Sequence, residues 1–366
     1  MGTGFKRFSR RQACAVLALF AAAVVFCVWV SLSPLGQGRA DAETGASGSD
    51  IALYKALADR VGCGESYYAV LAEELPARGY PTRSVFNWRT PLPMCLIGVA
   101  PEPIFAKGLL CILAGSVLLM GFEIGARDGG RAQSVLTALL LVGGILPCFI
   151  GDLYVMPVLW AGVLIAVSVC ALGLGWRKSG VAAGIAAVFF RDVAGPYCIL
   201  ALCAAIWQRR FKEALLWLGG LAAYAAFFLW HWVQIDPLRS ADAAAHSGGW
   251  VQFGGAAFVI ATAQMNGFLL NLPQWVTAVY LPLALLGFAS WQSRAGQFAG
   301  LSSVLFAVLF SFVGWEFNQY WGSITAPLLC LGAARAPLAL RDLWGRSAIT
   351  NPFHHGLTDH PRRIAS

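Results

Sequence analysis

Long apolar runs, separated by short segments with basic residues, occupy most of this 366-residue chain. Each run is close to the length of about 20 residues that a helix needs to cross the hydrocarbon core of a bilayer. The runs are continuous and do not alternate with a period of two, which favours membrane-spanning helices over a β-barrel. We expect about eight full spans, at residues 13–33, 104–124, 133–151, 154–175, 213–234, 275–292, 298–316 and 320–338.

Residues 180–208 depart from this pattern. Their apolar halves, 180–190 and 195–208, are each too short to cross a bilayer, and Arg191-Asp192 lies between them. We therefore predict a broken hairpin that reaches about the middle of the membrane and returns to the same side. The predicted fold class is all-α: a polytopic transmembrane helix bundle of about eight full spans plus a broken short-helix hairpin.

The basic residues predict the orientation of the chain. Residues 1–12 hold four basic side chains and no acid, and basic pairs follow several later runs, so both ends are expected in the cytoplasm. We expect a basic N-terminus (1–12), a transmembrane domain (13–338) and a C-terminal tail (339–366). Within the domain, residues 34–103 form a structured first extracytoplasmic loop, divided by Pro and Gly residues. A cleaved signal peptide is the alternative for the first run, but the run is long for one, and we favour an uncleaved span.

Composition supports a membrane protein. The chain is 58% hydrophobic and 12% charged, against about 25% charged residues in soluble domains. A net charge of +8 would be compatible with a nucleic-acid-binding protein. The basic residues lie at the ends of the predicted spans, however, where membrane topology requires them, so we exclude a nucleic-acid partner. Eight of the ten cysteines fall inside apolar runs, and no CxxC motif indicates a metal or redox site. Cys63 and Cys95 lie in or beside the first large loop and could pair in an oxidising compartment.

The first polar loop contains the stretch Gly64-Glu65-Ser66-Tyr67-Tyr68. A carboxylate at a membrane surface can take a proton from a sugar hydroxyl, so Glu65 is the predicted catalytic base. Tyr67 and Tyr68 are predicted to line a bound sugar. The alternative is a solvated loop acid beside aromatic residues at the level of the lipid headgroups.

The same loop continues through a Gly-Tyr-Pro turn at residues 79–81 to Asn87-Trp88-Arg89. Arg89 offers a planar guanidinium that suits phosphate or carboxylate, and Asn87 can bridge hydroxyls. Both are therefore predicted to bind substrate. An interfacial anchor made of Trp and Arg is the alternative.

Arg191 and Asp192 are charges expected inside the membrane, where a charge is costly and normally faces a cavity or a partner. We predict that Arg191 binds a lipid phosphate and that Asp192 orients it. A mutual ion pair that fastens the hairpin is the alternative. Asp152 follows the run 133–151 and could meet Glu65 across the mouth of the bundle, or it could be an ordinary acid at a span boundary.

Together, these segments resemble the layout of the GT-C glycosyltransferases, polytopic membrane enzymes that include bacterial mannosyl- and arabinosyltransferase-like proteins. The shared features are a first span, an outer loop with an acid and the pair Tyr67-Tyr68, and short broken helices with Arg191 in the membrane. The family more often has Asp at the position of Glu65. A second acidic motif would fall on Asp152, but no DxD occurs there, so a divalent metal cofactor has no support.

The resemblance implies transfer of a sugar from a polyprenyl-phosphate-linked donor to a glycan, lipid or protein acceptor, on the extracytoplasmic face of the inner membrane and with inversion at the anomeric carbon. A transporter or flippase for a lipid-linked substrate is one alternative, and a non-catalytic membrane scaffold is another. The enzyme hypothesis predicts that Glu65, Arg89, Asp152 and Arg191 converge on one outward-opening cavity. Scattered residues would favour the scaffold.

Overall fold

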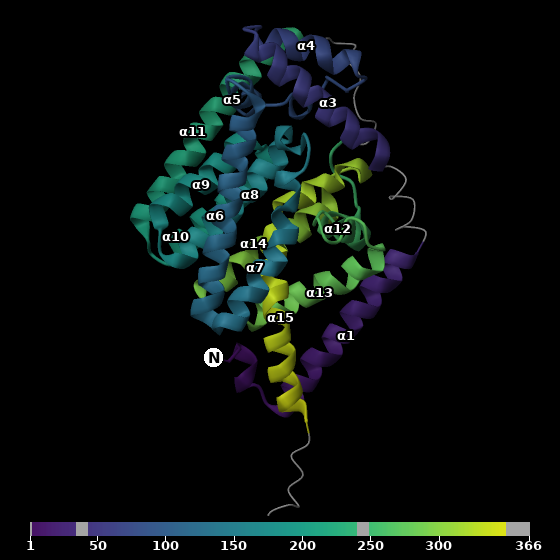
Figure 1. Cartoon of the computed structure of the whole chain (residues 1–366), viewed down its shortest axis with the longest axis vertical. Helices are drawn as coiled ribbons and strands as arrows, with labels where there is room; N and C mark the ends of the chain where they lie inside the picture. Colours follow the sequence, from purple (N-terminus) through teal and green to yellow (C-terminus); the bar gives the residue numbers. More distant parts are fainter. Residues whose placement is uncertain (1, 34–42, 240–248, 349–366) are drawn as a thin grey trace, which may run out of the picture.

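The computed structural model describes residues 2–33, 43–239 and 249–348 (Figure 1). Residues 34–42 of the predicted first loop and residues 349–366 of the predicted tail lie outside the described residues. Within the described ranges the chain is folded into helices and connecting turns, and no β-strand is present. The predicted all-α class is confirmed.

Six helices are long and apolar enough to cross a membrane. They are α1 (Arg10–Leu32), α6 (Pro103–Gly129), α7 with the 3-10 turn η3 (Arg131–Phe149), α8 (Pro157–Leu174), α11 with η6 (Phe211–Leu238) and α14 (Arg294–Phe312). The pair η7 (Glu316–Ile324) and α15 (Ala326–Ser347), bent by 67° at its break, passes the same test when taken together. The apolar helix α13 (Gln274–Ser290) is shorter. The multi-pass bundle is thus confirmed, with six or seven such spans among the described residues where about eight were predicted.

The segment predicted as a broken hairpin consists of α9 (Arg177–Phe190), η5 (Asp192–Ala194) and α10 (Gly195–Trp207). The break falls at Arg191, whose backbone is extended, with φ −151° and ψ 119°. Pro196 follows in the first turn of α10, where its missing N–H costs no helical hydrogen bond. Arg191 therefore lies at the joint between two short helices, and its depth in the membrane stays a prediction.

A cap of helices covers one end of the bundle, drawn at the top of Figure 1. It is formed by α3 (Glu43–Gly62), α4 (Tyr67–Ala77), η2 (Val85–Asn87) and α5 (Pro91–Gly98). The helices are held by a buried apolar layer of Leu53, Leu57, Val70, Leu71, Leu75 and Ile97. The backbones of α3 and α5 meet at Gly62 and Gly98, since a Cβ on Gly62 would lie 2.6 Å from the Gly98 carbonyl oxygen. The predicted structured first loop is this cap.

The opposite end of the bundle carries the N-terminus and the end of α15 (Figure 1). Here η1 (Gly4–Arg7) and α1 pack against α13 and α15. The backbone N–H and the hydroxyl of Thr3 donate to Asp342 Oδ2 at 2.9 and 3.0 Å. The first described residues and the last helix therefore share one end of the molecule, as the charge pattern predicts, while the compartment they face stays a prediction.

Between α11 and α13, the chain returns beneath the cap. The backbone N–H of Gln252 donates to Phe312 O at 2.8 Å, and that of Gly314 donates to Trp250 O at 3.1 Å. The short helix α12 (Gly255–Ala263) that follows is almost wholly buried. These contacts hold Trp250 beside η7, with its ring stacked on Trp321 at a centroid distance of 6.0 Å.

Candidate functional site

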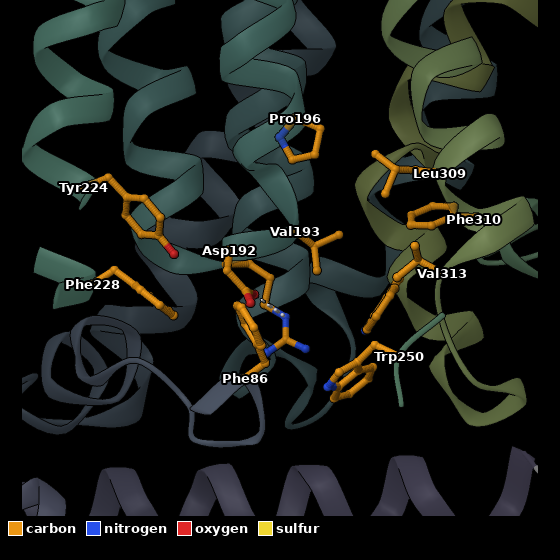
Figure 2. A pocket seen from close by; sticks show the side chains of 12 residues that line it. Phe86, Asp192, Val193, Pro196, Tyr224, Phe228, Trp250, Leu309, Phe310 and Val313 are labelled. Atoms are coloured by element: carbon orange, nitrogen blue, oxygen red, sulfur yellow. Dashed lines mark ion pairs between the residues drawn. The ribbon is translucent and has the colours of Figure 1, made fainter. Parts of the chain in front are cut away.

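Two adjoining cavities lie beneath the cap, and Trp250 lines both. The first, which we call the apolar cavity, measures about 450 Å³ (Figure 2). Its walls are Phe86, Arg191, Asp192, Val193, Pro196, Tyr224, Phe228, Trp250, Leu309, Phe310, Val313 and Trp321. The second, which we call the polar cavity, measures about 240 Å³. It is lined by Asp50, Arg78, Gly79, Tyr80, Pro81, Asn87, Arg89, Trp250, Phe317, Asn318 and Tyr320.

The apolar cavity is lined mainly by aromatic and aliphatic side chains, together with the charged residues Arg191 and Asp192. Tyr224 and Phe228 of α11 stand on one side, and Leu309 and Phe310 of α14 stand on the other (Figure 2). Asp192, at the α9–α10 break, lies between these two walls, and Arg191 beside it also lines the cavity. Such a combination suits an amphipathic ligand, because apolar walls favour hydrocarbon and a guanidinium favours an anion.

The Arg191 side chain is buried but incompletely paired. The residue is 8% exposed, and its Nε lies 3.8 Å from Asp192 Oδ1, beyond hydrogen-bonding distance. Within the described residues, Arg191 Nε, Tyr224 OH and Trp321 Nε1 are buried and make no hydrogen bond. A buried unpaired donor costs about 1–3 kcal/mol. Three of them around one cavity leave donors available for a ligand with hydrogen-bond acceptors.

The polar cavity contains a second acid–arginine pair. Asp50 is 5% exposed, and its Oδ1 accepts a hydrogen bond from Tyr80 OH. Arg89 Nη2 lies 3.8 Å from the same oxygen, and Arg89 Nε is buried without a hydrogen bond in the described structure. Burial lowers the pKa of Arg89, but Tyr54 and Asp50 outweigh it and hold that pKa above its ordinary value. Arg89 is therefore a permanent buried cation beside a buried carboxyl group.

The two arginines belong to one electrostatic unit. Arg89 and Arg191 interact with each other, and both interact with Tyr54 and Tyr320. The like charges would repel if no anion lay near them. Because Trp250 borders both cavities, the cations stand where the apolar and the polar cavity meet.

The other predicted residue of the loop, Asn87, also reaches the polar cavity. Its Nδ2 donates to Pro81 O at 2.6 Å, which closes the turn between residues 81 and 87. Of the eight predicted site residues, Asn87, Arg89, Arg191 and Asp192 thus line the two cavities.

Tyr67 and Tyr68 hold the cap together and line neither cavity. Tyr67 OH donates to the backbone oxygen of Arg89 at 2.7 Å, and burial raises the Tyr67 pKa well above its ordinary value, so it remains a donor. Tyr68 OH lies 2.9 Å from His231 Nδ1 and joins α4 to α11. Tyr67 therefore holds the Arg89 backbone in position without lining either cavity.

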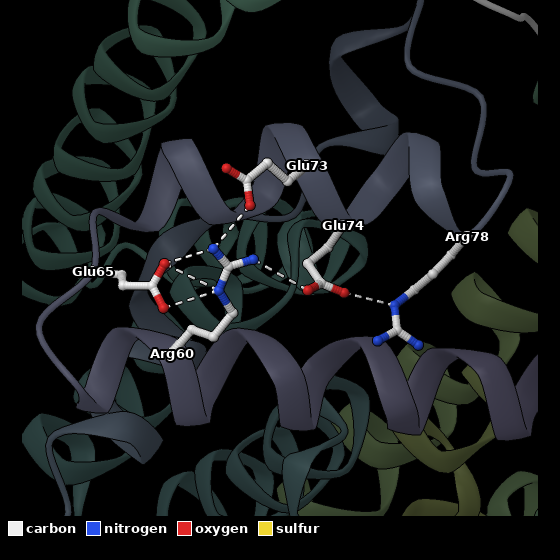
Figure 3. Close-up of polar contacts among 5 residues, drawn as sticks. All are labelled: Arg60, Glu65, Glu73, Glu74 and Arg78. Carbon is white, nitrogen blue, oxygen red and sulfur yellow. Dashed lines mark hydrogen bonds and ion pairs between the residues drawn. The ribbon is translucent and has the colours of Figure 1, made fainter.

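Glu65 lines neither cavity and belongs instead to a cluster of charged side chains around Arg60 (Figure 3). Arg60 Nη2 is 2.5 Å from Glu65 Oε2, and Arg60 also contacts Glu73 at 2.8 Å and Glu74 at 3.3 Å. The hydrogen bond from Arg60 lowers the pKa of Glu65. The Glu65 side chain is 46% exposed, so this is a solvated ion cluster.

Asp152 occupies a third place. Its carboxylate lies 2.7 Å from Lys55 Nζ and 3.7 Å from Lys107 Nζ, with about half of the side chain exposed. The expected convergence of four residues is therefore not observed. Arg89 and Arg191 line the two adjoining cavities, whereas Glu65 and Asp152 lie in separate ion pairs on the surface with basic partners of their own.

Sequence reasoning missed Asp50, Tyr80 and Trp250 as site residues. A signal for Asp50 was present, because Leu53, Tyr54 and Leu57 follow it at helical spacing and are buried. An acid on the buried stripe of a helix is a candidate by position alone. Trp250 had no comparable signal, since the long connection from α11 decides its place.

Two other observations complete the description of the site. Cys63 and Cys95 are both free thiols. Across residues 2–33, 43–239 and 249–348, no group of three or more His, Cys, Asp or Glu side chains could hold a metal ion.

Comparisons with known proteins give one similarity. No family model matches the chain, and no curated protein matches it. Among solved structures, the chain is similar to ArnT from Cupriavidus metallidurans in the apo state, with 15% sequence identity and a TM-score of 0.46. The aligned part covers 89% of this chain and 60% of that chain. At this low level of similarity, the function proposed below depends on the residues of this chain alone.

Proposed function

We propose that the protein is an integral membrane glycosyltransferase that transfers a sugar from a polyprenyl-phosphate donor to a glycan, lipid or protein acceptor. The observation that supports this most directly is the pair of buried, incompletely paired guanidiniums where an apolar and a polar cavity meet. The polyprenyl chain occupies the apolar cavity, the phosphate lies between Arg89 and Arg191, and the sugar lies in the polar cavity. The donor enters laterally from the bilayer between α11 and α14.

The reaction needs a base and a stabilised leaving group. An acidic side chain takes the proton of the acceptor hydroxyl, the hydroxyl oxygen attacks the anomeric carbon, and the bond from that carbon to the phosphate oxygen breaks. Arg89 and Arg191 stabilise the negative charge that develops on the departing polyprenyl phosphate. Attack on the face opposite the leaving group inverts the anomeric carbon.

Two acids compete for the role of base. Glu65 is the acid that the sequence predicts, and that assignment stays a prediction. Asp50 lines the polar cavity, where the acceptor hydroxyl and the sugar would meet, and this position favours it. Asn87 and Tyr80 would then contact the hydroxyls of the sugar, and Asp192 would orient Arg191.

The remaining proposals concern location. We propose that the cap faces the extracytoplasmic side of the inner membrane and that both ends of the chain are cytoplasmic. The cap helices lie at one end of the bundle and both described chain ends lie at the other, which supports this arrangement. A cysteine-labelling experiment with a membrane-impermeant reagent tests it, because the exposed Cys63 would react in intact spheroplasts.

A reconstituted assay tests the activity. Purified protein in liposomes without an ion gradient is given polyprenyl-phosphate-linked pentoses and hexoses with short glycan acceptors, and released polyprenyl phosphate and glycosylated acceptor are measured. Turnover that disappears in Arg191→Ala supports the transferase. Movement of the lipid across the bilayer without sugar transfer would instead support the flippase alternative.

A further inference from the structure

A third cavity, of about 560 Å³, lies on the far side of α3 from the polar cavity. We call it the junction cavity, since its walls come from cap helices α3 and α5, from the start of α6, and from the turn η4 (Leu153–Val155). Asp59 lines it and follows Asp50 by nine residues, which is about two and a half turns of helix. One face of α3 thus serves the polar cavity, and the opposite face serves the junction cavity.

Lys55, which lines the junction cavity, shares the carboxylate of Asp152 with Lys107. Lys55 Nζ is 2.7 Å from Asp152 Oδ2, and this hydrogen bond raises the pKa of Lys55 above its ordinary value. Lys107 Nζ is 3.7 Å from Asp152 Oδ1, beyond hydrogen-bonding distance, and lies 5.0 Å above the centre of the Tyr154 ring. Lys107 therefore retains donor capacity for a further anion.

The cavity lies at the ends of two candidate membrane spans. Pro103, the first residue of α6, is part of its wall, and the span formed by α7 and η3 ends at Phe149, just before Asp152. Val99, an exposed apolar residue, lines it, and the exposed Phe105 lies two residues after Pro103 in α6. An apolar rim with lysines and a tyrosine is typical of the level of the lipid headgroups.

The walls also carry an acid that is not already paired with Arg. Asp59 is exposed and faces the junction cavity one helical turn from Lys55. A headgroup that bears both a phosphate and an ammonium group would match the two lysines and this carboxylate together. A headgroup with a phosphate alone would leave Asp59 close to a second negative charge.

We propose that the junction cavity binds a phospholipid whose headgroup carries a phosphate and a primary amine. Lys55 and Lys107 contact the phosphate, Asp59 contacts the ammonium group, and the acyl chains run along the exposed apolar residues at the start of α6. Because the cavity walls belong to both the cap and the bundle, the bound lipid fastens the cap to the bundle. This site is separate from the proposed donor site and does not depend on the proposed transfer reaction.

Thermal unfolding of the full-length protein in detergent tests the proposal. The protein is titrated separately with phosphatidylethanolamine, phosphatidylglycerol and inorganic phosphate. We expect phosphatidylethanolamine to raise the Tm at the lowest concentration. For Lys55→Ala/Lys107→Ala, the concentration needed for a half-maximal shift should rise about tenfold or more, as expected for lost charge-assisted hydrogen bonds.

Matched variants keep the test decisive. Lys212→Ala, at the start of α11 and exposed, removes a lysine elsewhere and should respond as the wild type does. If the double variant fails to fold, Lys107→Ala takes its place in the test. It leaves the Lys55–Asp152 bond intact and should still weaken the lipid response. Asp59→Asn should bring the response to phosphatidylethanolamine down to that of phosphatidylglycerol.

Three results would overturn the proposal. One is an unchanged lipid response in both lysine variants. Another is an equal response of the wild type to the two phospholipids. The third is an equal Tm shift with inorganic phosphate alone.

Discussion

The cap contains two groups of charged side chains that differ in nearly every physical respect. On helices α3 and α4 and the turn between them, Arg60 contacts Glu65, Glu73 and Glu74 at 2.5–3.3 Å, within reach of solvent (Figure 3). Beneath the cap, Arg89 and Arg191 each lie 3.8 Å from one carboxylate, with only 10% of each side chain exposed. The exposed group has short, complete ion pairs, and the buried group has long, incomplete ones.

This difference separates charges that are satisfied by the fold from charges that are available to a ligand. Exposed ion pairs typically contribute about 0–1 kcal/mol to stability, and removing one leaves the rest of the protein unaffected. Buried cations without full pairing are costly to fold and are retained where they serve a site. Four sets of variants test how far this contrast determines activity and stability.

The largest effect is expected for Asp50→Asn. If Asp50 is the base, sugar transfer should fall by a factor of about 10² to 10⁴. Glu65→Gln, the matched change in the exposed group, should retain most of the activity. Initial rates with saturating donor, and the Tm of each variant as a control for folding, measure this. Loss of transfer in Glu65→Gln with retention in Asp50→Asn would restore the sequence-based assignment.

The next effect concerns the two buried cations. Arg191→Ala and Arg89→Ala should each lower kcat about 10² to 10³-fold, because charge on the departing phosphate loses a fixed partner. Arg191→Lys should recover part of the loss, since it restores the charge without the planar fork. Arg60→Gln is the control from the exposed group. Equal transfer rates in Arg191→Ala and Arg60→Gln would contradict the proposal that the buried arginines, and not the exposed ion cluster, serve the reaction.

A smaller effect is expected for the phenol in the apolar cavity. Tyr224→Phe should raise the KM for the donor about two- to tenfold, because one hydrogen bond to the phosphate is lost. Tyr68→Phe breaks the bond to His231 in the cap and should lower the Tm while leaving the donor KM close to that of the wild type. If only Tyr68→Phe changed the KM for the donor, the donor would bind near Tyr68 and not in the apolar cavity.

The smallest effect is a pH dependence in the exposed group. The pKa of Glu65 lies below its ordinary value of 4.5 because Arg60 donates to the carboxylate. The stabilisation is therefore present above pH 4.5 and is lost as the pH falls through the lower pKa of the folded state. Tm values at pH 7 and pH 3 should show a slightly smaller acid-induced decrease for Arg60→Gln than for the wild type. An acid-induced decrease larger in the variant would contradict this sign.

Several elements followed from the order of residues alone. The break at Arg191 was predicted because two apolar halves too short to cross flank a charged pair, and the structure has separate helices there. Arg89 was predicted to bind substrate because it places a planar guanidinium, which suits phosphate or carboxylate, in a polar loop. The buried stripe of its helix could have identified Asp50 as a site residue. It was missed because the polar sequence before it masks the start of the helical pattern.

What the sequence determined by itself is the helical membrane architecture, since bilayer thickness and backbone hydrogen bonding leave one solution for long apolar runs. It also identified two of the cations at the proposed site. Only the tertiary structure decided which acid accompanies them, because Glu65 and Asp50 differ in their partners and not in their chemistry. Arg60, in the last turn of α3, lies five residues before Glu65 and pairs with it, whereas Asp50 reaches Arg89 through a chain reversal that no local pattern encodes.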